Sequence, residues 1–184
     1  MVPDSDDRKV ICLLIRFAGP DDCDHIANLY VASHRETYKD LLPDRYFDML
    51  TPVYAKEKWT HYLQESGSRI WVAYEKDRFL GFSAGSEDKD LPDTWLLDSL
   101  HVVGAARGKG VGTALIRTNG MYAVENGFLR MSICIVRGNE KARLLYEKLG
   151  AEHDSFFDDD FCGTISHSEK LVWNHPEILR DPSA

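Results

Sequence analysis

The sequence predicts a single α/β domain: a mixed sheet of about seven strands with helices on both faces. Three observations carry this prediction. At 184 residues the chain is long enough to bury a hydrophobic core without disulfides or metals. Apolar runs of strand length alternate with segments of helical periodicity. In the middle of the chain, a strand, a helix and a second strand follow one another, which predicts parallel strands joined by a crossover helix.

The N-terminal part predicts a strand followed by two helices. The apolar run over residues 10–18 predicts the strand. Asp21 or Asp22 can cap the first helix, which is expected to last to about Leu42, where Pro43 stops it. A second helix is expected from Pro52, because proline fits the first helical turn. The residues that share one face of this helix are Tyr54, Ala55, Lys58, Trp59 and Tyr62.

The remaining elements alternate. They are, in order, strands over 69–75, 79–86 and 95–102, a helix over 111–126, a strand over 128–136, a helix over 139–149, and strands near 155–157 and over 164–173. The acidic run DSFFDDDF (154–161) is interpreted as a solvated loop that would attract an ammonium group if it bordered a cleft. Residues 1–9 and 176–184 are expected to be tails around one domain over 10–175.

Composition excludes several classes of function. The net charge of -8 disfavours nucleic-acid binding, which needs a basic surface. No apolar run approaches the roughly 20 residues that span a bilayer, and the acidic N-terminus does not resemble a signal peptide. The four cysteines show no metal-ligand spacing, so they are interpreted as reduced, which favours a cytoplasmic protein without a metal.

The stretch RGKGVG, from Arg107 to Gly112, separates a strand pattern from a helix pattern. Glycines at a helix N-terminus let a ligand reach backbone amides that lack helical partners, and such a site favours phosphate. A P-loop requires G-x-x-x-x-G-K-S/T, and a dinucleotide loop requires G-x-G-x-x-G. Here Lys109 is followed by Gly110 and the glycines are spaced G-x-G-x-G, so neither loop fits.

Two motifs resemble one known family. SLHVVGAARGKGVGTALI resembles the acetyl-CoA signature of the GNAT N-acetyltransferases, Arg/Gln-x-x-Gly-x-Gly/Ala, with Arg107, Gly110 and Gly112 in its three fixed positions. NEKARLLYEKLGAE resembles the later motif of the family, with Asn139 followed seven residues on by Tyr146. The resemblance covers most of the chain and implies a GNAT fold whose central parallel strands splay apart around acetyl-CoA.

The resemblance also implies how acetyl-CoA is held. Backbone groups of the central strand are expected to pair with the pantetheine arm, the glycine loop to hold the pyrophosphate, and Asn139 to reach the pantetheine or acetyl end. The expected cofactor-binding residues are Leu100, His101, Val102, Arg107, Gly108, Lys109, Gly110, Val111, Gly112, Thr113, Asn139 and Tyr146. By its position in the motif, Tyr146 is interpreted as the general acid that protonates the departing thiolate.

The general base and the acceptor pocket are less determined. Asp98 on the central strand, Glu87 at the end of the preceding strand and ordered water are the candidate bases. Tyr38 and His34, between the first two helices, are candidates for the acceptor pocket. His101 is interpreted as a core histidine that faces the helix-packed side of the sheet.

The sequence therefore predicts an N-acetyltransferase that transfers the acetyl group of acetyl-CoA to a primary amine of a small molecule or peptide in a ternary complex. The alternative is a non-catalytic domain that binds or senses acyl-CoA. A homodimer through the last strands is a further expectation, because Phe156, Phe157 and Phe161 suit an interface. Nothing in the sequence identifies the acceptor.

Overall fold

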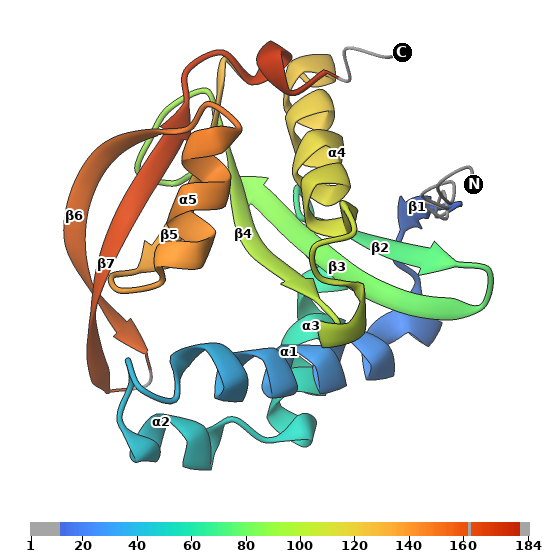
Figure 1. Ribbon diagram of the computed structural model, residues 1–184, viewed down its shortest axis with the longest axis vertical. Helices are drawn as coiled ribbons and strands as arrows, with labels where there is room; N and C mark the ends of the chain where they lie inside the picture. Colours follow the sequence, from blue (N-terminus) through green and yellow to red (C-terminus); the bar gives the residue numbers. More distant parts are fainter. Residues whose placement is uncertain (1–11, 162, 181–184) are drawn as a thin grey trace, which may run out of the picture.

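The computed structural model describes residues 12–161 and 163–180, and in this part of the chain seven strands form one mixed sheet (Figure 1). The strands lie in the order β1-β2-β3-β4-β5-β7-β6. They are β1 (Leu14–Phe17), β2 (Arg69–Glu75), β3 (Arg78–Glu87), β4 (Thr94–Val102), β5 (Arg130–Val136), β6 (Glu152–Phe161) and β7 (Thr164–Trp173). The helices are α1 (Cys23–Tyr38), α2 (Asp44–Met49), α3 (Pro52–Gln64), α4 (Val111–Glu125) and α5 (Glu140–Lys148). The predicted fold class is confirmed.

Helices cover both faces of the sheet, and each face has its own hydrophobic core. On one face α1 and α3 bury Ile26 and Trp59 against Phe82 of β3. On the other face α4 buries Leu115 and Ile116 against residues of β4 and β5. Removing these large side chains from water is the main stabilisation of the layered arrangement.

The central unit is β4–α4–β5, as the sequence predicts. β4 and β5 are the one parallel pair among the described strands, and α4 connects them. Their pairing is short, because it runs only from Thr94 opposite Arg130 to Leu97 opposite Ile133. Beyond that point the strands diverge (Figure 1). The expected splay is therefore present, and it begins in the middle of β4.

A β-bulge lies at the point of divergence. The β3–β4 ladder pairs Gly85 with Leu97 and then Ala84 with Ser99, so Asp98 has no counterpart on β3. An extra residue shifts the alternation of side chains between the two faces of the sheet. Leu97 faces the α4 core before the bulge, and Leu100 and Val102 face it afterwards. The bulge thereby turns Ser99 and His101 toward α1.

The first helix is shorter than predicted. α1 ends at Tyr38, and after a turn the separate helix α2 begins behind Pro43, which adopts an extended conformation as its N-cap. The residue before a proline disfavours helical backbone, so the chain turns at Leu42 instead of continuing the helix. The sequence pattern does not separate this turn from α1, and it does not reveal α2.

The acidic run is a strand, not the predicted solvated loop. β6 extends over Glu152–Phe161 and pairs along its length with β7, far beyond the predicted 155–157. It is an outer strand of the sheet, where charged side chains can face water without disrupting the ladder. The aspartate-rich composition therefore does not predict a strand, and β6 forms one because it pairs with β7 in a hairpin.

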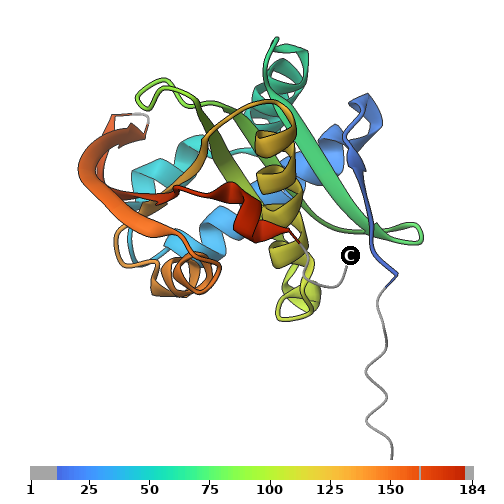
Figure 2. The same ribbon diagram turned by 90° about the horizontal axis from the view of Figure 1, so that it is seen from above.

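The C-terminal segment also differs from the expected tail. Residues Pro176–Leu179 form a short 3₁₀ turn that packs on α4, where Leu179 is buried against Gly120 (Figure 2). This part of the chain belongs to the domain. The predicted N-terminal tail over 1–9 lies outside the described residues, as do residues 181–184.

Candidate active site

A cleft of about 990 Å³ opens where β4 and β5 part, and it brings together most of the predicted site residues. It is bounded by β4, β5, the loop before α4, the start of α5 and the inner side of α1. The predicted residues that line it are His34, Tyr38, Asp98, Leu100, His101, Val102, Arg107, Gly108, Gly110, Gly112, Thr113, Asn139 and Tyr146. Sequence positions up to 112 residues apart thus converge at one opening, from His34 to Tyr146.

The glycine loop leaves open space beside its backbone. Gly108 and Gly110 have φ angles of 73° and 85°, in the left-handed region that favours glycine. A Cβ added at either position would meet no other atom within 4 Å, so the space above these two residues is free for a ligand. Gly110 is the N-cap of α4, whose first amides lack partners within the helix. The loop therefore fits an anionic group such as pyrophosphate.

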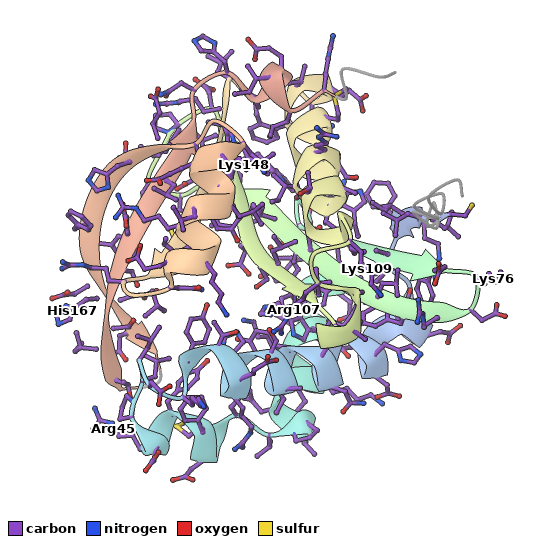
Figure 3. All side chains as sticks on the ribbon, in the orientation of Figure 1. Arg45, Lys76, Arg107, Lys109, Lys148 and His167 are labelled. Atoms are coloured by element: carbon purple, nitrogen blue, oxygen red, sulfur yellow. The ribbon has the colours of Figure 1, made fainter. Side chains whose placement is uncertain are left out.

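Two predicted loop residues do not line the cleft with their side chains. Lys109 is exposed on the loop (Figure 3). Val111 is buried in the α4 core. Lys109 can therefore act on an anion at a distance through its charge, and Val111 can contribute only its backbone amide.

Arg107 ties the loop to α1. Its guanidinium forms a two-pronged ion pair with Glu36, with Nη1–Oε1 and Nη2–Oε2 distances of 2.7 and 2.9 Å. Its Nε also donates to the carbonyl oxygen of Val102. Hydrogen bonding from Arg107 lowers the pKa of the Glu36 carboxyl, so the pair stays ionised near neutral pH. In this geometry the arginine orients the loop.

Asn139 and Tyr146 lie on the opposite wall of the cleft. The Asn139 side chain caps α5 by accepting a hydrogen bond from the Ala142 amide. Tyr146 is 5% exposed and packs edge-on against Trp173. Burial raises the pKa of the Tyr146 phenol, so the group is protonated at physiological pH and can donate.

The two candidate carboxylate bases lie in different places. Asp98, at the bulge, lines the cleft and accepts a hydrogen bond from Ser99 Oγ. Glu87 does not reach the cleft, because β3 runs antiparallel to β4 and pairs Glu87 with Trp95, before the point where the sheet opens. The proposal of Glu87 as a base is therefore withdrawn.

Two buried histidines form the α1 side of the cleft. His101 Nδ1 lies 3.0 Å from Ser33 Oγ, and its ring stacks on Phe82, as expected for a core histidine that faces the helices. Burial lowers the pKa of His101 well below its ordinary value. Burial and the nearby Lys58 charge lower the pKa of His34 to about 3. Both rings are therefore neutral at physiological pH.

A chain of polar side chains lies behind His34, and sequence reasoning does not find it. His34 Nδ1 lies 2.7 Å from the Tyr46 hydroxyl, the His34 ring packs on the Tyr30 ring with centroids 4.1 Å apart, and Lys58 Nζ donates to the Tyr30 hydroxyl over 3.1 Å. The one feature of the sequence that could have indicated this chain is Lys58, a single cation on the otherwise apolar face of its helix. Tyr46 cannot be found in this way, because it lies on the unpredicted helix α2.

Comparison with known proteins agrees with this geometry. The model of the acetyltransferase (GNAT) family matches residues 23–151. The chain belongs to the GNAT acetyltransferase family. This GNAT chain is 34% identical over 98 residues to the uncharacterized N-acetyltransferase YhfO of Bacillus subtilis, an alignment that covers 52% of the chain and 66% of YhfO.

Two further proteins resemble this GNAT chain over most of its length. The uncharacterized N-acetyltransferase YuaI of Bacillus subtilis is 24% identical over 169 residues, covering 90% of the chain and 95% of YuaI. The PaiA N-acetyltransferase of Thermoplasma acidophilum, crystallised with coenzyme A, superposes with a TM-score of 0.69 at 18% identity, covering 86% of this chain and 98% of PaiA. At that identity the superposition establishes the shared fold.

The described residues meet the requirements of neither a metal site nor a membrane-spanning helix. Across residues 12–161 and 163–180, no group of three or more His, Cys, Asp or Glu side chains is arranged to hold a metal ion. No helix of the same residues is long and apolar enough to cross a membrane.

Proposed function

We propose that this protein transfers the acetyl group of acetyl-CoA to a primary amine of a small molecule or peptide, by direct attack within a ternary complex. One observation carries the proposal: a single cleft joins the glycine loop, the parted strands, the Tyr146 phenol and the Asp98 carboxylate. An anion-binding loop, a proton donor and a proton acceptor are the groups that this reaction requires.

The residues of the cleft fit acetyl-CoA. The amides from Gly108 to Thr113 would bind the pyrophosphate. The edge of β4 that faces β5 has no strand partner beyond Leu97, so backbone groups of Leu100 and the Val102 N–H can pair with the amides of the pantetheine arm, while the Val102 carbonyl already accepts from Arg107. Asn139 would contact the same arm near its thioester end. Bound acetyl-CoA supplies the activated acetyl group.

The chain must also help the amine to react. An amine with an ordinary pKa of about 10.4 is neutral in only roughly one molecule in 10³ at pH 7, which costs about 4–5 kcal/mol. Asp98, directly or through water, is the candidate that accepts the ammonium proton. A backbone N–H at Val102 would stabilise charge on the carbonyl oxygen, and the Tyr146 phenol would donate to the departing sulfur.

The alternative is a domain that binds acyl-CoA without turnover. A sensor needs the glycine loop but has no use for a buried, protonated tyrosine at the same opening. Release of free thiol from acetyl-CoA in the presence of an amine panel separates the two functions. Thiol release that depends on the amine supports the enzyme, whereas tight acetyl-CoA binding without release on any amine would support the sensor.

Location and assembly are part of the same proposal. A reducing cytoplasm agrees with Cys12, Cys23 and Cys134, which form no disulfide with one another or with any other described residue. A homodimer through the outer strand β6 is favoured by Phe156, which is 56% exposed there; Phe157 is partly exposed, and the Phe161 side chain lies outside the described part. Light scattering that finds a monomer at assay concentration would exclude the homodimer.

A further inference from the structure

Lys58 on α3 and Asp98 on β4 are two opposite charges that no ion pair with another described residue neutralises. Lys58 and Asp98 both line the cleft. Among residues 12–161 and 163–180, no carboxylate oxygen lies within 4.0 Å of Lys58 Nζ, and no cationic nitrogen lies within that distance of Asp98. By contrast, Lys56 on the same helix is paired with Asp24 at 2.7 Å. Asp98 is exposed to water, whereas Lys58 is partly buried, so a carboxylate of a ligand would stabilise the Lys58 ammonium where water has limited access.

Lys58 is held in place. Its Nζ donates to the Tyr30 hydroxyl and lies over the rings of Tyr30 and Trp59, at 4.6 and 4.9 Å from their centroids. The Tyr30 ring is packed in turn against the rings of His34 and Trp59, with centroids 4.1 and 5.3 Å apart. A cation supported in this way loses little side-chain freedom when it pairs with a ligand, so its geometry favours specific binding.

Lys58 and Asp98 both lie near the Tyr30 side chain. The Asp98 charge adds to the burial that raises the pKa of Tyr30, the residue to which Lys58 donates. Asp98 and Asp159 likewise add to the burial that raises the pKa of Cys134 to about 12. The cleft therefore has an acidic side near the point where the strands part and a basic side on α3.

We propose that the acceptor is a small amino carboxylate, such as a free amino acid, whose amine lies beside Asp98 and whose carboxylate pairs with Lys58. This inference rests on the proposed acetyl transfer and specifies its substrate. The amine end then lies where the sheet opens, next to the expected thioester. The N–C bond forms and the C–S bond breaks. The ammonium nitrogen loses two protons to Asp98 or water and keeps one in the amide. The thiolate takes one proton from Tyr146, which regains it from water.

Other amines fit the charges less well. A polyamine brings no carboxylate to Lys58, and its second cation would have to turn away from Lys58 toward Asp159 or Glu140, which also line the cleft. A peptide N-terminus carries an amide next to its amine in place of a carboxylate, so it leaves the Lys58 ammonium without a counter-charge. Pairing a partly buried ammonium with a carboxylate is expected to favour the acid over its carboxamide by about 10- to 100-fold.

The test compares free amino acids with their carboxamides as acceptors, by thiol release from acetyl-CoA. Each pair shares the amine and the side chain, so only the carboxylate differs. The carboxamide has the less basic amine and is more often neutral, so a preference for the acid cannot come from amine protonation. We expect at least one amino acid to exceed its carboxamide by about 10-fold or more in kcat/KM.

Variants assign the preference to Lys58. In Lys58→Met the ratio of acid to carboxamide should fall to near one, while Lys58→Arg should retain part of it. Lys56→Met removes a lysine from the same helix outside the cleft and should leave the ratio unchanged. Because the ratio is taken within each variant, partial loss of folded protein does not alter it. Equal rates for acid and carboxamide in the parent, or a ratio that survives Lys58→Met, would overturn the inference.

A binding measurement separates this inference from the proposed function. Calorimetry of the CoA-saturated protein with the same amino acids and carboxamides requires no turnover. If amino acids bind more tightly than carboxamides through Lys58 but no thiol is ever released, the carboxylate site stands and acetyl transfer fails. If thiol is released only on amines without a carboxylate, acetyl transfer stands and the carboxylate site fails. Absence of binding and of turnover for every amino acid would also overturn it.

Discussion

Leu97 and Ile133 form the last pair of the parallel β4–β5 ladder, and the cleft opens directly beyond them. One residue later, Asp98 leaves the β3–β4 ladder as well. The same point in β4 thus frees a backbone edge for a pantetheine arm and places a carboxylate at the base of the opening. The cleft forms because the β4–β5 ladder ends at Leu97 and the β3–β4 ladder shifts its register directly afterwards.

Gly112→Asp should weaken acetyl-CoA binding by at least about 10-fold without unfolding the domain. Gly112 lines the cleft, and a Cβ there meets Val102 only at an ordinary contact distance of 3.7 Å, so the fold tolerates a side chain while a carboxylate repels pyrophosphate. Calorimetry measures the affinity. Gly104→Asp, at a glycine with open space outside the cleft, is the matched control and should bind normally. Normal binding by folded Gly112→Asp would refute the phosphate assignment.

Gly110→Ala tests the backbone conformation of the loop. The φ angle of 85° forces an alanine into the left-handed region, which costs about 1–2 kcal/mol. We expect a modest loss of thermal stability together with weaker acetyl-CoA binding, because relaxation of the strain moves the amides that face the ligand. Melting curves with and without CoA measure both effects. A variant that gains as much stability from CoA as the parent does would show that the conformation is not needed for binding.

The value of kcat/KM should rise from pH 6 toward pH 8–9. The acceptor or its base must lose a proton before attack. His34 and His101 do not titrate in this window, since both pKa values lie well below it, and Tyr146 stays protonated because its pKa is raised. The rise therefore reports the acceptor amine. A flat profile, with chemistry shown to be rate-limiting, would argue against an amine acceptor.

Stability should fall as the pH decreases from about 6.5 to about 4. The folded-state pKa of His34 is lowered to about 3, so within this window the unfolded chain binds a proton that the folded chain does not. The stabilisation is complete above the unfolded pKa and declines by up to about 1.4 kcal/mol per pH unit for each such histidine. Denaturant unfolding at several pH values measures it. His34→Gln should show a slope smaller by about one proton, and an unchanged slope would contradict the buried neutral state.

Asp88→Ala should destabilise the domain by about 3–5 kcal/mol. Lys170 Nζ lies 3.1 and 3.0 Å from the two carboxylate oxygens of Asp88, and Ser132 Oγ donates to the same carboxylate. Both ionised residues are buried, so removal of Asp88 leaves the Lys170 ammonium with only the exposed Asp90 carboxylate, 3.5 Å away. Denaturant unfolding gives the loss. Asp88→Leu combined with Lys170→Met should recover much of it, and a double variant as unstable as the single one would contradict this explanation.

Local signals in the sequence are sufficient to predict the central unit of the fold. The glycine loop, the Asn139 cap and the periodicity of α4 depend on neighbouring residues, and each is correctly located. The positions of Asn139 and Tyr146 at α5 follow from the same local pattern. These elements supply the wall of the cleft and the glycine loop that we propose binds pyrophosphate.

What the sequence leaves open depends on pairing between distant segments. The bulge at Asp98 arises from the register of β3 on β4, and no feature of the residues around it predicts a shift. Glu87 is misplaced for the same reason, since its distance from the cleft depends on which end of β3 meets the opening. β6 is a strand because β7 pairs with it, despite its aspartates. Lys58 lines the cleft only because α3 packs beside α1, and that packing cannot be predicted from the residues around Lys58.

Tyr146→Phe tests most directly whether the cleft is catalytic. The substitution removes one oxygen from a buried ring and leaves its packing on Trp173 intact. If the phenol donates to the departing thiolate, the contact strengthens only as charge develops on sulfur, so kcat should fall by roughly 10²-fold while acetyl-CoA affinity stays nearly unchanged. Steady-state kinetics and calorimetry on the same preparation give both quantities. A kcat within about threefold of the parent would contradict the assignment and make Tyr146 a core residue.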